Sequence, residues 1–264
     1  MKIDIAGTRV AFEVDGDGTT VLFLHAFPLS AAMWAEPAAA LARRFRVVRL
    51  DVRGFGGSEI GGAPLTMGRI AEDAAAVLDH LGAEQAAVVG CSMGGYAALA
   101  FAQRFAARLC GLVLVDTKAS ADTDEGRAGR AALAQKVLAQ GAVAAADAML
   151  PKLVGATTHR EQPDVVDAVR REILAAAPGA IANALQAMGA RPDSRPALGA
   201  IGVPTLVLRG EEDAIISAED AQVLHEGISD SRLVTLPRIG HLPSLEGPAA
   251  FEAALSGFLA PLKC

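Results

Sequence analysis

The chain has 264 residues, of which 24 are Lys or Arg and 30 are Asp or Glu, so its formal net charge is −6 at pH 7. A chain of this length can bury roughly 75% of its unfolded surface, so we expect one large domain, or one domain that carries an insertion. The acidic balance leaves no basic stripe to neutralise phosphates, which argues against nucleic acid as a partner. Three cysteines do not make a disulfide framework, and the start Met1-Lys2-Ile3-Asp4 lacks the apolar run of a signal peptide. We therefore expect a cytoplasmic protein.

The first predicted elements form a hairpin, in which residues 2–5 and 9–14 flank a short Ala-Gly turn. Short apolar runs then alternate with longer segments of helical periodicity, such as residues 70–81 and 251–262. The runs are residues 21–24, 47–50, 86–89, 112–115, 205–208 and 233–236. Several are continuously apolar, as strands buried on both faces of a sheet must be. This alternation predicts an α/β fold with a mostly parallel, doubly wound sheet covered by helices on both faces.

One uncharged stretch, residues 85–103, is long enough to be mistaken for a membrane-spanning helix. Its middle argues against that interpretation, because Gly90, Gly94 and Gly95 surround Ser92 and mark a turn. The valines before the turn favour a strand, and the alanine-rich run after it favours a helix. The stretch therefore predicts a strand, a sharp turn and a helix, with no membrane partner.

The strand–helix alternation stops between residues 117 and 196. This segment contains no Phe, Trp or Tyr, and its pattern predicts about four helices, near residues 125–140, 141–154, 163–176 and 179–190. We interpret it as a helical cap inserted between two strands of a core formed by residues 1–116 and 197–264. The alternative is a second free-standing domain, which the scarcity of large apolar side chains makes the weaker hypothesis.

The sequence Gly90-Cys91-Ser92-Met93-Gly94 has the form G-x-S-x-G between a predicted strand and a predicted helix. In this context the motif indicates a sharp turn that lifts a nucleophilic serine out of the sheet. The alternative is an ordinary serine that caps the following helix. Cys91 itself is interpreted as a packing residue, because cysteine is among the most often buried residue types.

A serine hydroxyl needs an adjacent base to act as a nucleophile at neutral pH. Among the five histidines, His241 stands in a loop after the last predicted strand, which returns to the same edge of the sheet as Ser92. We predict that His241 is the base and that Asp213, which follows the strand at 205–208, is the acid that orients it. Asp116 is the competing acid, since it also ends a strand, but we expect its carboxylate to accept hydrogen bonds from the first turn of the cap. His80, His159 and His225 are interpreted as structural, whereas His25 ends a strand at the edge of the sheet where a site could form.

Five ordered motifs together resemble the α/β-hydrolase superfamily of serine hydrolases. They are His25-Ala26-Phe27-Pro28, residues 51–58 (DVRGFGGS), the serine turn, Gly210-x-x-Asp213, and the run from Gly240-His241 to Glu246, Pro248 and Phe251. The resemblance implies an α/β-hydrolase fold and an oxyanion hole formed by the backbone N–H groups of Phe27 and Met93. It also implies that residues 51–58 are mainly a structural turn.

Within the superfamily the chain is similar to small bacterial carboxylesterases and 3-oxoadipate enol-lactonases. We therefore expect a hydrolase that cleaves carboxylic esters of small to medium acyl chain, with an enol-lactonase that takes a carboxylate-bearing lactone as the alternative. A ligand receptor without turnover is a third hypothesis, which the intact Ser92, Asp213 and His241 set disfavours. The sequence contains no phosphate-binding loop and no metal-ligand cluster, so no cofactor or metal is expected.

The expected cap contributes two groups of side chains that bear on the substrate. Aliphatic walls for the acyl group are predicted from Met149, Leu150, Leu153, Leu185 and Met188. Basic residues of the cap, among them Arg127, Arg130 and Lys152, are expected to be solvated, or alternatively to meet a substrate carboxylate as a lactonase requires.

Overall fold

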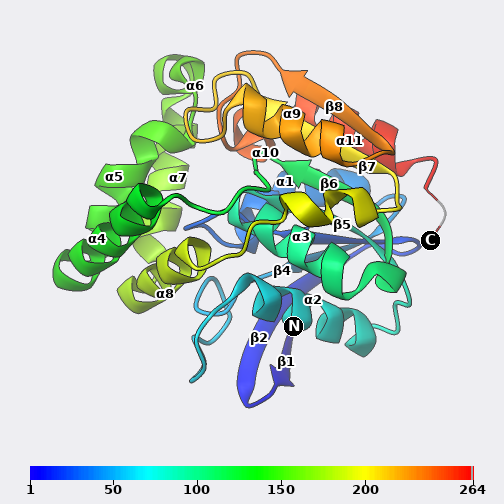
Figure 1. Cartoon of the computed structure of the whole chain (residues 1–264), viewed down its shortest axis with the longest axis horizontal. Helices are drawn as coiled ribbons and strands as arrows, with labels where there is room; N and C mark the ends of the chain where they lie inside the picture. The colour runs from blue at the N-terminus through cyan, green and yellow to red at the C-terminus, as the bar shows by residue number, and fades with distance from the viewer. Residues whose placement is uncertain (263) are drawn as a thin grey trace.

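The computed structural model describes residues 1–262 and 264, and within them eight strands form one sheet in the order β1-β2-β4-β3-β5-β6-β7-β8 (Figure 1). The pairs β1–β2 and β2–β4 are antiparallel, and the strands from β4 to β8 are parallel. The strands are β1 (Lys2–Ile5), β2 (Thr8–Asp15), β3 (Thr20–Leu24), β4 (Arg46–Leu50), β5 (Ala86–Cys91), β6 (Leu109–Val115), β7 (Thr205–Gly210) and β8 (Ser231–Leu236). The predicted mostly parallel, doubly wound sheet is confirmed.

Helices cover both faces of this sheet. They are α1 (Ala35–Leu41), α2 (Met67–His80), α3 (Met93–Arg104), α4 (Asp124–Gln140), α5 (Val143–Leu153), α6 (Ala156–Glu161), α7 (Pro163–Ala175), α8 (Pro178–Gly189), α9 (Ala218–Gly227), α10 (Pro243–Glu246) and α11 (Pro248–Leu259). On one face α2 packs against α3, and on the other α1 packs against α11. The second interface is built on aromatic rings, because Phe23 of β3 contacts Trp34, which in turn contacts Phe251 of α11.

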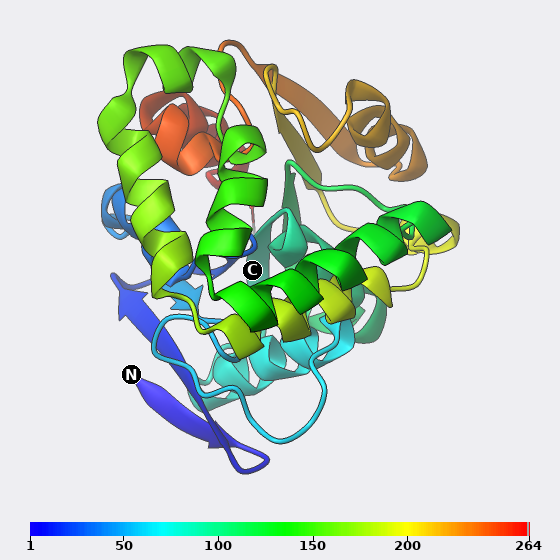
Figure 2. The ribbon, with the colours of Figure 1, turned by 90° about the vertical axis from the view of Figure 1, so that its left-hand side faces the viewer.

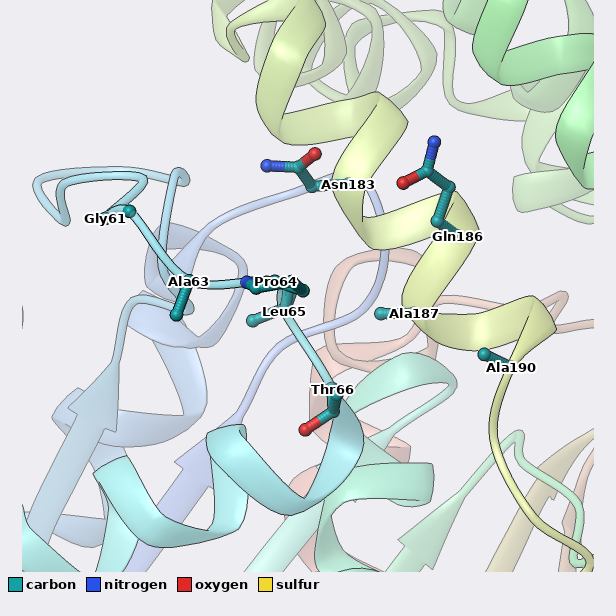
Figure 3. Close-up of a pocket in the computed structure, with 10 residues that line it drawn as sticks. Gly61, Ala63, Pro64, Leu65, Thr66, Asn183, Gln186, Ala187 and Ala190 are labelled. Atoms are coloured by element: carbon teal, nitrogen blue, oxygen red, sulfur yellow. The ribbon is translucent and has the colours of Figure 1, made fainter.

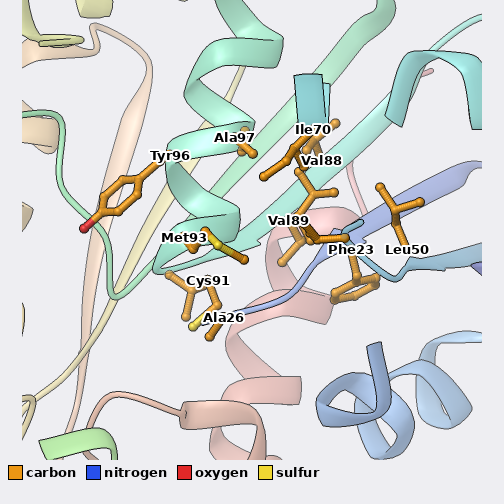
Figure 4. Close-up of a cluster of buried hydrophobic side chains, with 14 of the residues drawn as sticks. Phe23, Ala26, Leu50, Ile70, Val88, Val89, Cys91, Met93, Tyr96 and Ala97 are labelled. Carbon is orange, nitrogen blue, oxygen red and sulfur yellow. The ribbon is translucent and has the colours of Figure 1, made fainter. Parts of the chain in front are cut away.

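The core is continuous because the central strands are apolar along their whole length. Every residue of β3, β5 and β6 is buried, as expected for strands with helices on both sides. Figure 4 shows side chains of β3 and β5, such as Phe23 and Val88, together with Ile70 of α2. This rigid layer holds the loops at the carboxyl ends of the strands in fixed positions.

Helices α4 to α8 lie in sequence between β6 and β7 and gather at one side of the molecule (Figure 2). Thr123 caps the start of helix α4, because its hydroxyl accepts a hydrogen bond from the N–H of Gly126, and α4 packs against α8. The two ends of the segment are joined by ion pairs, since buried Asp122 pairs with Arg191 at 2.8 Å and also with Arg130. Four of these helices agree with the prediction, whereas the short helix α6 is not predicted from the sequence.

The structure contains a disulfide that was not predicted from the sequence. Cys110 of β6 forms a disulfide with Cys264, and their Cα atoms are 5.3 Å apart. The two residues are 154 positions apart in the chain, so only the fold brings them together. Among the described helices, none combines the length and the hydrophobicity that crossing a bilayer would take.

Candidate active site

Ser92 occupies a tight turn between β5 and α3, with φ of 53° and ψ of −112°. Its backbone is held on both sides, because its N–H donates to the carbonyl of Val115 and its carbonyl accepts from the Thr117 hydroxyl, both at 2.9 Å. The Ser92 hydroxyl makes no capping hydrogen bond to α3. The alternative that this serine is an ordinary helix cap is therefore wrong, and its hydroxyl is left available for other chemistry.

The turn at Ser92 requires a glycine two residues later, at Gly94. A Cβ atom on Gly94 would lie 2.1 Å from the carbonyl oxygen of Leu24, at the end of β3. Glycine at this position lets the first turn of α3 pack directly on the chain that leaves β3. Figure 4 shows the result, with Ala26 beside Cys91 and Met93.

His241 and Asp213 come together from two loops at the carboxyl end of the sheet. His241 Nδ1 lies 2.8 Å from Asp213 Oδ2, and both side chains are at most 1% exposed. The His241 loop also reaches the serine strand, because the Cys91 thiol lies 3.6 Å from the His241 carbonyl oxygen that accepts its hydrogen bond. Asp213 and His241 are thus hydrogen-bonded next to the turn that carries Ser92.

The local contacts of Asp213 favour its ionised form. Burial raises the pKa of this carboxyl, but the adjacent His241, its hydrogen bonds and the Ile215 N–H outweigh that cost and hold the pKa below its ordinary value. Asp213 Oδ1 accepts from the N–H groups of Ile215 at 2.7 Å and Ile216 at 3.2 Å. These two donors fix which carboxylate oxygen faces His241.

Asp116 is near this pair, but it does not have the role expected of it. Its Oδ1 accepts the N–H of Gly210 at 2.9 Å, at the end of β7, rather than hydrogen bonds from the first turn of α4. Its other oxygen points at no donor in the described part of the chain. Burial raises the pKa of Asp116 well above its ordinary value, and the neighbouring Asp213 carboxylate raises it further. Asp116 is consequently the carboxyl of the pair that retains its proton more readily.

The chain after β3 forms the other wall of the site. His25 is fully buried, with Nδ1 hydrogen-bonded to the Ala26 carbonyl and Nε2 accepting the N–H of Val52, both at 3.0 Å. Burial lowers the pKa of His25, so it is a neutral structural residue that fixes this turn. Among residues 1–262 and 264, no acceptor is hydrogen-bonded to the N–H of Phe27 or of Met93.

The turn at residues 51–58 supports the same wall. Asp51 accepts the N–H groups of Ala31 and Gly57 at 2.8 Å each. The hydroxyl of Ser58 donates to the Asp51 carbonyl at 2.7 Å. These contacts give the motif a structural role.

Cys91 is buried and free, and burial raises the pKa of its thiol well above the ordinary value. A thiol that stays protonated is a poor nucleophile. Its place beside Ala26 and Met93 in the core agrees with the packing role predicted for it.

Among the described residues, Asp116, Asp213 and His241 place candidate metal-ligating atoms within 4.8 Å of one another. Within this group His241 Nδ1 is hydrogen-bonded to Asp213, and Asp116 Oδ1 accepts the N–H of Gly210, whereas Asp116 Oδ2 has no hydrogen-bond partner among the described residues. A second buried carboxyl group, that of Asp116, thus lies beside the hydrogen bond between His241 and Asp213.

Two of the cavities in the described part of the chain lie between the segment that contains α4 to α8 and the rest of the protein. One, of about 410 Å³, lies between the loop at Gly61–Thr66 and helix α8, where Asn183 and Gln186 face it (Figure 3). The other, of about 310 Å³, lies between Pro28, Phe55 and the end of α7 near Ala176. The second cavity adjoins the chain after β3, because Pro28, which lines it, directly follows Phe27.

The side chains predicted as acyl walls have mixed surroundings. Leu153, Leu185 and Met188 are buried, but Met188 Sδ lies 3.4 Å from a guanidinium nitrogen of Arg130, so it packs against α4. Arg127 pairs with Asp124, and Arg130 pairs with Asp122. Arg130 is thus paired with a buried carboxylate, whereas the pair of Arg127 with Asp124 is exposed to solvent.

Sequence reasoning missed the groups that hold the His241 loop. Glu246 is 4% exposed and accepts hydrogen bonds from backbone groups next to His241 and from α6. In the sequence, Glu246 was marked only by its spacing from His241. That spacing does not identify the groups to which its carboxylate is hydrogen-bonded.

A family model for the alpha/beta hydrolase fold matches residues 19–248. The chain belongs to the α/β-hydrolase family. Among solved structures, this hydrolase is similar to a thermophilic esterase from Thermogutta terrifontis solved with malate bound, with 38% identity, a TM-score of 0.95, and 98% and 97% of the two chains covered. It is also similar to the enol-lactonase from Burkholderia xenovorans LB400, with 30% identity, a TM-score of 0.91, and 98% and 100% covered.

Among curated relatives, 3-oxoadipate enol-lactonase 2 of Acinetobacter baylyi is 28% identical over 92% of this chain and 89% of its own. The relatives are named esterases and enol-lactonases, and the site joins a serine turn to a buried His–Asp pair. The protein is an enzyme of the hydrolase class.

Proposed function

We propose that this hydrolase cleaves carboxylic esters through an acyl-enzyme on Ser92, with His241 as base and Asp213 as the acid that orients it. The observation that carries the proposal is the buried 2.8 Å contact between His241 Nδ1 and Asp213, beside a serine whose hydroxyl caps nothing. A hydrogen bond from Nδ1–H to Asp213 leaves Nε2 free to take the serine proton. The family membership and the esterase relative support the same reaction class.

In the proposed mechanism, Ser92 Oγ attacks the ester carbonyl while its proton moves to His241 Nε2. The carbonyl oxygen becomes an oxyanion, which the N–H groups of Phe27 and Met93 stabilise. One such donor contributes roughly 3–4 kcal/mol to barrier lowering. His241 then protonates the leaving alcohol as the C–O bond breaks. A water molecule then gives a proton to His241 and attacks the acyl carbonyl. As the bond between the acyl carbon and Ser92 Oγ breaks, His241 returns this proton to Oγ, which releases the acid and restores Ser92.

We further propose that residues 117–196 act as a cap over this site, with residues 1–116 and 197–264 as the core. Contacts with the core support this division. Ser30, three residues after Phe27, donates to Glu172 of α7 at 2.7 Å. A Cβ on Gly54 would lie 2.6 Å from the Cβ of Ala180 in α8, so the turn and the cap are in close contact.

A neutral ester is the favoured substrate over a carboxylate-bearing lactone. Arg127 and Arg130, which could have met a substrate carboxylate, are paired with Asp124 and Asp122. The alternative remains an enol-lactonase, which the names of two relatives favour.

Steady-state rates decide among the hypotheses. We expect p-nitrophenyl acetate and butyrate to be turned over many times per enzyme molecule, which a receptor would not do. Matched neutral and carboxylate-bearing lactones provide the comparison. A kcat/KM for the charged lactone far above that for every neutral ester would favour the lactonase.

We expect kcat/KM to rise with pH, because the proposed base accepts a proton only in its neutral form. The direction follows because an imidazolium cannot accept the Ser92 proton. Asp213 does not produce this rise near neutral pH, because its pKa is held below its ordinary value. Initial rates at low substrate concentration and constant ionic strength measure the profile. A flat profile, with acyl transfer shown to limit the rate, would remove His241 from the role of base.

A further inference from the structure

Glu246, the last residue of α10, holds the backbone on both sides of His241. Its Oε2 accepts the N–H of Gly240 at 3.0 Å, and its Oε1 accepts the N–H of Leu242 at 2.8 Å. These two residues are the immediate neighbours of His241. A single buried carboxylate thus fixes the peptide units that determine where the imidazole points.

The same carboxylate is held from the other side by the cap. Its Oε2 also accepts the N–H of Gly155 and the hydroxyl of Thr158, both at 2.7 Å. The side-chain amide of Gln162 donates to the main-chain carbonyl of Glu246 at 3.0 Å. Gly155, Thr158 and Gln162 are the start, the middle and the end of the α6 region, so this short helix is attached to Glu246 along its length.

Helix α6 also touches the loop that carries the acid. The N–H and the hydroxyl of Thr157 both donate to the carboxylate of Glu212 at 2.7 Å. Glu212 immediately precedes Asp213. One helix of the cap therefore contacts both loops that present the Asp213–His241 pair.

The cap and the His241 loop are packed backbone to backbone. A Cβ atom on Gly240 would lie 2.1 Å from the backbone nitrogen of Gly155. No side chain separates the two segments, so a shift of α6 moves the loop directly.

The carboxylate of Glu246 has no cationic partner in the described part of the chain. Its hydrogen-bond donors are the N–H and hydroxyl groups named above. Loss of one donor leaves a buried charge less satisfied and its position less fixed.

We propose that Glu246 is a positioning residue for His241, and that helix α6 of the cap sets the orientation of His241 through it. The inference rests on the proposed function of Ser92, His241 and Asp213. It goes beyond that function because it makes the cap a part of the machinery that sets the turnover rate. Contacts at α6 should then affect kcat, whereas an ordinary cap contact should affect substrate binding or stability.

The sharpest variant is Thr158→Val, which keeps the shape of the side chain and removes only the hydroxyl that donates to Glu246. We expect kcat for a p-nitrophenyl ester to fall about tenfold with KM within about twofold, because a small misplacement of a catalytic group is costly. Thr123→Val is the matched control. It removes a hydroxyl from the same cap, at the start of α4, but that hydroxyl contacts Gly126 and has no link to Glu246. We expect its kcat within about twofold of the parent protein.

Glu246→Gln is the second variant. An amide keeps the size of the side chain but turns an NH2 group toward N–H donors on one side, so the backbone around His241 loses part of its support. We expect about a 10²-fold fall in kcat on folded protein. Two readouts do not depend on ester turnover. One is the proton resonance of the His241 imidazole N–H, and the other is the rate of Ser92 labelling by a fluorophosphonate. Both should change in Glu246→Gln and Thr158→Val and stay unchanged in Thr123→Val.

If Glu246 has a purely structural role, the substitutions at Glu246 and Thr158 should lower thermal stability. The His241 resonance and the kcat of Thr158→Val should then equal those of Thr123→Val. This result would overturn the inference. The two proposals fail separately. If the parent protein turns over no ester while labelling and the resonance still respond to Thr158→Val, positioning by α6 stands and the substrate proposal is wrong.

Discussion

Replacement of Ser92 by alanine is expected to lower ester hydrolysis by about 10⁶-fold, the loss seen when the nucleophile of another serine hydrolase is removed. The hydroxyl is the only group lost, and its oxygen forms the acyl bond in the proposed mechanism. The fold should be unaffected, because the Ser92 hydroxyl makes no capping hydrogen bond and the backbone hydrogen bonds of Ser92 are retained. Rates with p-nitrophenyl acetate, corrected for spontaneous hydrolysis, measure the loss.

The control for this prediction is the thermal transition of the variant, followed by circular dichroism. A transition close to that of the parent protein shows that the loss is chemical. Substantial turnover by a correctly folded Ser92→Ala protein, purified free of host esterases, would mean that another residue is the nucleophile.

Asp213→Asn is expected to lower kcat by about 10⁴-fold, by analogy with the same change in another catalytic triad. The structure gives a specific reason. Oδ1 of Asp213 accepts the N–H groups of Ile215 and Ile216, so the amide oxygen of an asparagine will take that position. Its NH2 group then faces His241 Nδ1 and donates to it. This contact favours the tautomer with the proton on Nε2, which cannot accept the proton of Ser92.

Asp116→Asn is the matched control, because it makes the same chemical change in the adjacent carboxyl group. The amide oxygen keeps the hydrogen bond from the Gly210 N–H, and the NH2 group can donate toward Asp213 as a protonated carboxyl would. We therefore expect a loss below about tenfold. A crippled Asp116→Asn protein beside a nearly normal Asp213→Asn protein, both folded by circular dichroism, would assign the acid to the end of β6 and contradict the account.

The sequence predicted the sheet and the position of the serine turn well because both depend on local patterns. Continuously apolar runs must be strands buried on both faces, and the glycines around Ser92 leave no other local structure. The closeness of His241 and Asp213 was also predictable, since loops after parallel strands meet at one edge of the sheet. Their 2.8 Å contact agrees with that expectation.

The parts that were missed depend on contacts between segments far apart in the chain. Helix α6 has the sequence Ala-Thr-Thr-His-Arg-Glu, which lacks apolar periodicity, and it is held by Glu212 and Glu246 instead. The partner of Asp116 is the Gly210 N–H on the neighbouring strand, so no local signal distinguished this partner from the N–H groups in the first turn of α4. The Cys110–Cys264 disulfide spans 154 positions and needs the complete fold to be formed.

The most direct test of the central claim is to identify the residue that becomes acylated. Brief reaction with a slowly deacylating p-nitrophenyl ester, acid quenching and peptide mass spectrometry should find the acyl group on the peptide that contains Ser92. The amount of acylated Ser92 should match the initial burst of p-nitrophenol. The label should be absent in Ser92→Ala and much slower to form in Asp213→Asn. An acyl group on Cys91, on His241 or on any other residue, formed at the rate of the burst, would contradict the account.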